Sequence, residues 1–144
     1  MLIRAVCCGA PHNSTLEHMF GAPSQDVERS FRTFVQQWFR VLADGQWSAA
    51  IAMLDEPNSY GVRWSEVQIR NALDEYSSGA KVSDPANVKG KVPRASSGKF
   101  DDGSGYWFDH SVPLNGAWSD LTAQFEFKRR GEQYAVILHD LHVL

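Results

Sequence analysis

The chain has 144 residues, a formal net charge of −3 and a pI near 5.9, with 43% hydrophobic and 22% charged residues. This length and composition predict one domain with a packed core. The acidic balance argues against nucleic acid, which needs a concentrated basic surface, and no apolar stretch approaches the roughly 20 residues of a membrane span. The two cysteines, Cys7 and Cys8, are adjacent and form no disulfide framework, which favours a cytoplasmic location.

The first half of the chain is predicted to be helical. Residues 1–23 are expected to form a flexible extension, and residues 24–144 a single domain. Apolar residues from Val27 to Leu42 repeat at helical spacing, so we expect an amphipathic helix that Gly45 ends.

Two further helices are expected. A short one covers residues 47–56 and is stopped by Pro57. The next opens at Ser65, where Gln68 three residues later predicts a capping box, and Gly79 closes it.

The second half is predicted to be a β-meander. The Gly-, Ser- and Pro-rich region 79–105 offers one or two weak edge strands near residues 88–94. Asn115-Gly116 is the preferred pair for a type I′ hairpin turn, and it joins strands at 105–114 and 117–129. A last strand, 133–143, follows Gly131. Helices followed by antiparallel strands indicate an α+β fold, with the helices packed on one face of a curved sheet.

The hairpin turn predicts which side chains share a face. One row is mostly apolar and is expected to face the helices; its pairs are Leu114 with Ala117, Val112 with Ser119, His110 with Leu121, Phe108 with Ala123, and Tyr106 with Phe125. The other row is polar but carries two tryptophans; its pairs are Pro113 with Trp118, Ser111 with Asp120, Asp109 with Thr122, and Trp107 with Gln124.

The polar row is a candidate protein-binding face. Tryptophan is enriched at binding hot spots, and acidic residues surround it here. The alternative is that another strand or the loops of residues 79–104 cover the row. The candidate binding residues are Trp107, Asp109, Trp118, Asp120, Gln124 and Glu126.

His110, Asp140 and His139 are the candidate catalytic residues. A histidine on the helix-facing row could act as a general base. If Phe127 pairs with Tyr134, Asp140 joins that face two strands away from His110. A bulged turn would instead bring His139 round and turn Asp140 away. The competing interpretation is a structural role at the end of the sheet.

We expect no metal site and no cofactor. His139 and His142 lie three residues apart on a strand, so their rings point to opposite faces and cannot chelate one ion.

Two stretches resemble known families. The segment "PLNGAWSDLTAQFEFKRRGEQYAVILHDLHVL", residues 113–144, is similar to the end of a family of small, uncharacterised bacterial proteins with a Pro-Leu-Asn-Gly-x-Trp-Ser-Asp-Leu-Thr hairpin and a His-Val-Leu tail. "FRTFVQQWFRVLADGQWSAAIAMLDE" resembles the opening of NTF2-like (cystatin-like cone) domains. The resemblance implies a curved sheet wrapped around helices with a pocket between them, but it implies no catalytic residues.

The mouth of such a cone would hold Tyr60 and Arg63, which could bind a carboxylate or phosphate. The alternative is a surface arginine in a loop. At least five large rings are aimed at the cone, which predicts that it is filled; they are Phe31, Phe34, Trp38, Phe108 and Phe125.

These observations favour a non-enzymatic, cytoplasmic binding protein that uses its acidic, Trp-bearing sheet face. Its partner would be another protein, as for a toxin-immunity or accessory protein, or a second copy in a homodimer. The alternative is an NTF2-like enzyme of isomerase, dehydratase or cyclase type, which uses His110 and Asp140 on a small apolar molecule.

Overall fold

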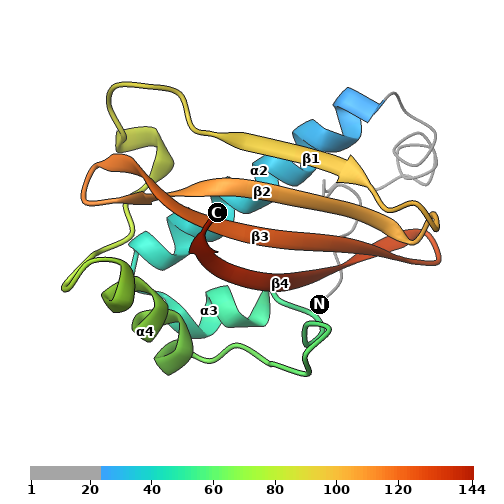
Figure 1. The fold of residues 1–144 in the computed structure, drawn as a ribbon, viewed down its shortest axis with the longest axis horizontal. Coiled ribbons are helices and arrows are strands. Elements are labelled where there is room, and N and C mark those ends of the chain that lie inside the picture. The colour runs from blue at the N-terminus through green and yellow to red at the C-terminus, as the bar shows by residue number, and fades with distance from the viewer. Residues whose placement is uncertain (1–23) are drawn as a thin grey trace.

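The structure is a computed structural model that describes residues 24–144. The predicted extension and both cysteines lie outside the described residues. The fold is α+β, with helices preceding a four-stranded antiparallel sheet of order β1-β2-β3-β4 (Figure 1). The elements are α2 (Ser24–Ala43), α3 (Trp47–Ala52), α4 (Glu66–Tyr76), the 3₁₀-helix η2 (Pro85–Asn87), β1 (Ala95–Lys99), β2 (Gly105–Leu114), β3 (Ala117–Arg130) and β4 (Gln133–Val143).

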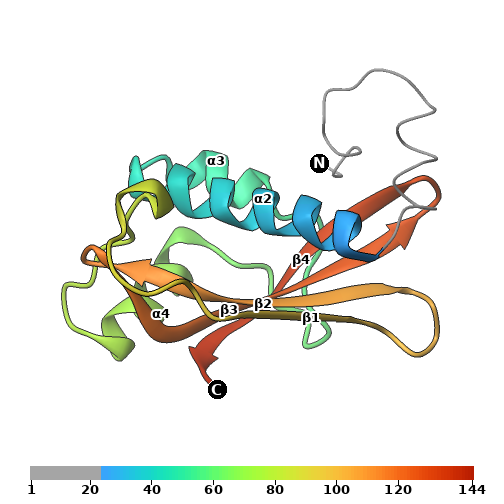
Figure 2. The same cartoon turned by 90° about the horizontal axis from the view of Figure 1, so that it is seen from above.

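Helix α2 covers one face of the sheet. Figure 2 shows α2 and α3 along the same side of the strands. The predicted stripe of α2 faces the core, with Phe34 and Val41 half-buried and the rest buried, and Phe39, which the pattern did not include, is buried as well. The ring of Phe31 stacks on that of Phe127 at 4.0 Å, and Trp38 meets Phe125 edge-on at 5.2 Å. Aromatic rings therefore fill the space between helix and sheet.

The predicted second helix is too long, because α3 ends at Ala52. Asp55, which was predicted to lie in this helix, hydrogen-bonds the backbone of β4, an edge strand of the sheet. Its N–H donates to the Val136 carbonyl at 2.8 Å, and its Oδ2 accepts from the Val136 N–H at 2.8 Å. Edge-strand groups that would otherwise lack partners are thereby satisfied.

The capping box of α4 is confirmed. Ser65 Oγ accepts from the Gln68 N–H at 3.3 Å, and Gln68 Oε1 accepts from the Ser65 N–H at 2.9 Å.

The predicted edge strand at 88–94 is wrong, since β1 is Ala95–Lys99. This segment, "ASSGK", has low strand propensity. Its small residues suit its neighbours, because Ser97 and Gly98 pair with Phe108 and Trp107.

The Asn115-Gly116 turn is confirmed. Both residues have positive φ, 53° and 85°, as a type I′ turn requires. The turn also fastens the preceding loop, because the Asn115 N–H donates to the Lys81 carbonyl at 2.9 Å and the Gly116 N–H donates to Ser83 Oγ at 2.7 Å.

The hairpin register is as predicted only near the turn, at Leu114–Ala117 and Pro113–Trp118. Beyond a bulge, His110 pairs with Ala123 rather than Leu121. Ser119 Oγ causes this shift, because it donates to the Val112 carbonyl at 2.7 Å and accepts from the Leu121 N–H at 3.2 Å. The shift is two residues, so the side chains of the paired stretch keep their faces.

The register of β4 matches neither predicted alternative. Phe127 pairs with Val136, and the core face of β4 carries Tyr134, Val136 and Leu138. A second bulge separates the pairs Phe125–Leu138 and Gln124–Asp140, and it leaves His139 as the extra residue.

His110 is fully buried under α2, and both of its ring nitrogens lie within hydrogen-bond distance of other residues. The Ser111 carbonyl lies 2.8 Å from His110 Nδ1, and a carbonyl can only accept, so Nδ1 carries the proton. Nε2 then accepts from the Gln36 amide at 3.2 Å. Burial lowers the pKa of His110 from 6.5 to about 4; the charge of Arg32 adds to this, and the Ser111 hydrogen bond opposes it.

We predict that His110→Gln makes the free energy of unfolding depend less steeply on pH below neutrality than it does in the wild-type protein. Between about pH 4 and 6.5 the unfolded chain binds a proton at His110 that the folded protein does not. The free energy of unfolding should therefore fall as pH drops, by up to ~1.4 kcal/mol per pH unit from this group. Urea unfolding from pH 4.5 to 7.5 measures it.

Val112→Ala, at a buried residue with no titratable group, is the control and should lower stability while keeping the wild-type slope. An unchanged slope in His110→Gln would contradict the buried neutral ring.

Candidate functional site

The sheet face opposite α2 carries two rows of side chains that cross the strands. The first row runs from Gly98 in β1 through Trp107 and Glu126. The second runs from Ser96 through Asp109 and Gln124 to Asp140 in β4. Directly opposed side chains on one face have Cβ atoms about 5 Å apart. The register thus places an indole, carboxylates and an amide together.

Four of these side chains, together with that of His139, line a shallow pocket of about 250 Å³. We call them the open-face site; they are Trp107, Asp109, Gln124, Glu126 and His139. Three strands contribute to it, so its geometry is fixed by the backbone pairing of β2, β3 and β4.

Gly98 sets the position of the Trp107 indole. A Cβ placed on Gly98 would lie 2.7 Å from Cζ2 and Nε1 of Trp107, which is closer than packed atoms approach. The indole therefore lies directly against the backbone of β1. No sequence pattern indicated this role, although a glycine inside a short strand is a sign of close approach.

The carboxylates of the site are partly removed from water. Burial raises the pKa of Asp109, while a hydrogen bond from Gln124 and the charges of His139 and His142 oppose the rise. Only 18% of the Glu126 side chain is exposed. Within residues 24–144, neither carboxylate forms an ion pair with a lysine or arginine.

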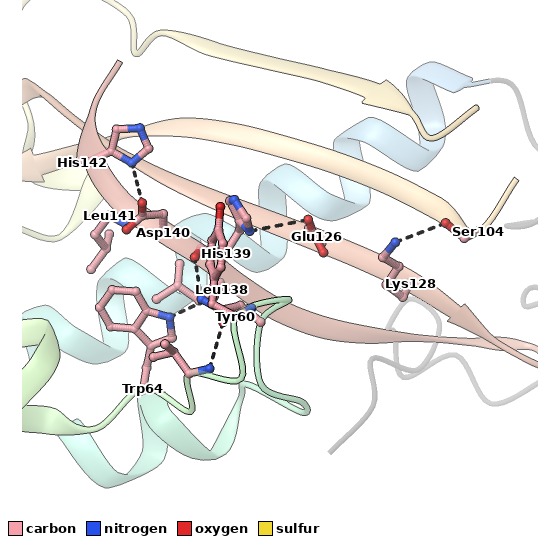
Figure 3. A network of polar contacts seen from close by, with 12 residues as sticks. Tyr60, Trp64, Ser104, Glu126, Lys128, Leu138, His139, Asp140, Leu141 and His142 are labelled. Carbon is pink, nitrogen blue, oxygen red and sulfur yellow. Dashed lines mark hydrogen bonds and ion pairs between the residues drawn. The ribbon is translucent and has the colours of Figure 1, made fainter. Parts of the chain in front are cut away.

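His139 enters the site because of the bulge in β4. Its Nδ1 lies 3.7 Å from Glu126 Oε2 and has no hydrogen-bond partner (Figure 3). Its carbonyl accepts from Asn58 Nδ2 at 2.9 Å, and its ring lies 5.7 Å from that of Tyr60. The neighbouring Leu138 carbonyl accepts from Trp64 Nε1 at 2.9 Å. The loop before α4 therefore holds the bulge in place.

A second hollow, of about 450 Å³, adjoins the site at His139. Tyr60 lines it and is 77% exposed. Asp140 also lines it and lies 2.9 Å from His142 Nδ1. Arg63, the predicted partner of Tyr60, is exposed and does not line this hollow.

The structure separates two predicted binding residues from the open-face site. The Trp118 ring lies 5.4 Å from that of His110, which is too close for rings on opposite faces of a sheet. The predicted face of Trp118 is therefore wrong, because the bulge beside it breaks the alternation. Asp120 is exposed and pairs with Arg94 at 3.3 Å.

The register that would place Asp140 on the helix-facing side with His110, two strands away, is also wrong. His110 pairs with Ala123, and Asp140 pairs with the next residue, Gln124. Successive residues of a strand point to opposite faces, so His110 is under α2 and Asp140 is on the open face. His139 and Asp140 lie on the open side together because His139 is the extra residue that the bulge inserts between Leu138 and Asp140.

Comparison with known proteins gives no match for this chain among protein-family models, curated proteins or solved structures. In the part of the chain that the structure describes, no helix is both long and apolar enough to cross a membrane. In the same residues, no three His, Cys, Asp or Glu side chains are grouped so that they could hold a metal ion.

We predict that Gly98→Val displaces the Trp107 indole and leaves the protein folded. The new side chain occupies space that the indole now fills, and Trp107 is only half-buried, so the ring should swing outward. The Trp107 indole N–H resonance in a ¹H–¹⁵N spectrum measures this.

Ser96→Val, on the same face of the same strand, is the control and should leave that resonance in place. An unmoved resonance in Gly98→Val would contradict the packing of Trp107 on Gly98.

Proposed function

We propose that this protein is a non-enzymatic binding module that docks a protein partner on the open-face site. One observation carries the proposal: half-buried carboxylates at Asp109 and Glu126 stand beside Trp107 without a lysine or arginine partner among the described residues. Carboxylates removed from water are unfavourable unless they are paired. A partner that brings positive charge would supply the missing pairing.

The composition of the site supports a protein partner. Tryptophan ranks among the residues that contribute most to binding energy at interfaces, above all where surrounding contacts exclude water. The adjoining hollow extends the surface past His139 to the exposed ring of Tyr60. The two concavities together offer a central anchor and a polar rim, as in many interfaces.

We further propose that the domain is NTF2-like and works in the cytoplasm. A curved antiparallel sheet with helices along one face supports the first point. A toxin-immunity or accessory role would suit a small acidic domain such as this one. A second copy of the chain is the alternative partner, and a small molecule the alternative ligand.

We predict that Trp107→Ala and Glu126→Gln each lose the partner, whereas Asp120→Asn keeps it. The first two residues line the open-face site, and Asp120 lies outside it. The wild-type protein and the variants are used as bait in extracts of the native host, with quantitative mass spectrometry of the captured proteins.

Thermal unfolding checks that each variant is folded, and light scattering measures whether the chain dimerises. Equal capture by all four baits would contradict a binding role for this face. A dimer that Trp107→Ala dissociates, with no other protein captured, would identify a second copy as the partner.

A further inference from the structure

We propose that the open-face site holds one arginine side chain of the partner, with its guanidinium stacked on Trp107 and hydrogen-bonded to Asp109 and Glu126. This inference rests on the proposed function and names the chemistry that the site recognises.

The geometry suits a flat, forked cation. Trp107 stands directly across from Glu126, and Asp109 is two residues along the same strand, so the indole has a carboxylate on two sides. A guanidinium presents five N–H donors in a plane, stacks on aromatic faces and bonds carboxylates in pairs. A lysine ammonium is a strongly hydrated point charge and fits such a site less well.

The size of the pocket indicates a single side chain. Its volume of about 250 Å³ falls below the roughly 300–1,000 Å³ of pockets that hold drug-sized ligands. Gln124 and His139 complete the lining of the pocket, and the hydrogen bond from Gln124 opposes the rise of the Asp109 pKa.

The chain itself uses both kinds of contact elsewhere. Arg130 donates to both carboxylate oxygens of Glu56, at 3.0 and 2.7 Å. Arg70 lies over the Trp47 ring at 4.4 Å while it bonds Glu66 at 2.7 Å. The second case joins an indole, a guanidinium and a carboxylate, which is the arrangement inferred for the open-face site.

Charge also distinguishes this site from the rest of the sheet face. Lys128 follows Glu126 on the same face, but it lies over the Phe100 ring at 4.0 Å and bonds Ser104 Oγ at 3.2 Å. Lys128 therefore points away from the pocket, toward Ser104 (Figure 3). No lysine or arginine of the described residues pairs with either carboxylate, so an arginine from outside would supply that pairing.

The test uses small probes and the full chain. N-acetyl-arginine amide is titrated against ¹⁵N-labelled protein, with N-acetyl-citrulline amide as the uncharged isostere and N-acetyl-lysine amide as the compact cation. We expect a saturable shift of the Trp107 indole N–H with the arginine probe, a weaker response to lysine and none to citrulline. Glu126→Gln and Asp109→Asn should each weaken arginine binding about tenfold, which corresponds to ~1.4 kcal/mol, and Asp120→Asn should not.

Equal shifts from citrulline and arginine, or shifts that spare Trp107, would overturn the inference. The proposed function is judged separately by partner capture. If Trp107→Ala loses the partner but the arginine probe does not compete with it, the partner still docks on this face. That result would overturn only the inference that the site holds an arginine side chain. A partner that the arginine probe displaces, and the citrulline probe does not, supports both.

Discussion

The stacking of α2 on the sheet is the interaction on which the rest of the structure depends. Phe31 lies on Phe127 at 4.0 Å, and Tyr134 meets Phe31 edge-on at 5.1 Å, so the helix joins two strands through one aromatic cluster. Because α2 and α3 occupy that side, the side chains on the opposite face of the sheet must find their packing and polar partners elsewhere. The aromatic cluster thus determines which face of the sheet the helix covers, and the open-face site lies on the other face.

The sequence predicted which residues share a face better than it predicted which residues pair. Alternation and the Asn115-Gly116 turn are local properties, and they placed Phe108, Phe125 and Trp107 on the correct sides. The pairing depends on Ser119, whose hydroxyl replaces backbone hydrogen bonds inside the hairpin. A serine gives no pattern by which such a bulge can be recognised, and the two-residue shift leaves the faces of the regularly paired residues beyond the bulge unchanged.

The candidate site was predictable in part for the same reason. Trp107, Asp109, Gln124 and Glu126 lie in regularly paired stretches, and the structure brings them together. Trp118 lies next to a bulge, so alternation fails there. His139 joins the site only because the loop before α4 bonds the carbonyls around it, and these contacts span 74 residues or more of sequence. No local pattern carries that information.

The two bulges have different consequences for the open face of the sheet. The bulge near Ser119 turns Trp118 toward His110. Ser111 and Thr122, which pair just beyond this bulge, are buried. The one at His139 sets a ring between two hollows on the open side. A bulge bends its strand and re-aims a side chain, so the same distortion withdraws one aromatic from the open face and adds one titratable ring to it. The indole and the carboxylates of the open-face site are thereby left together around Trp107, where the backbone pairing is regular.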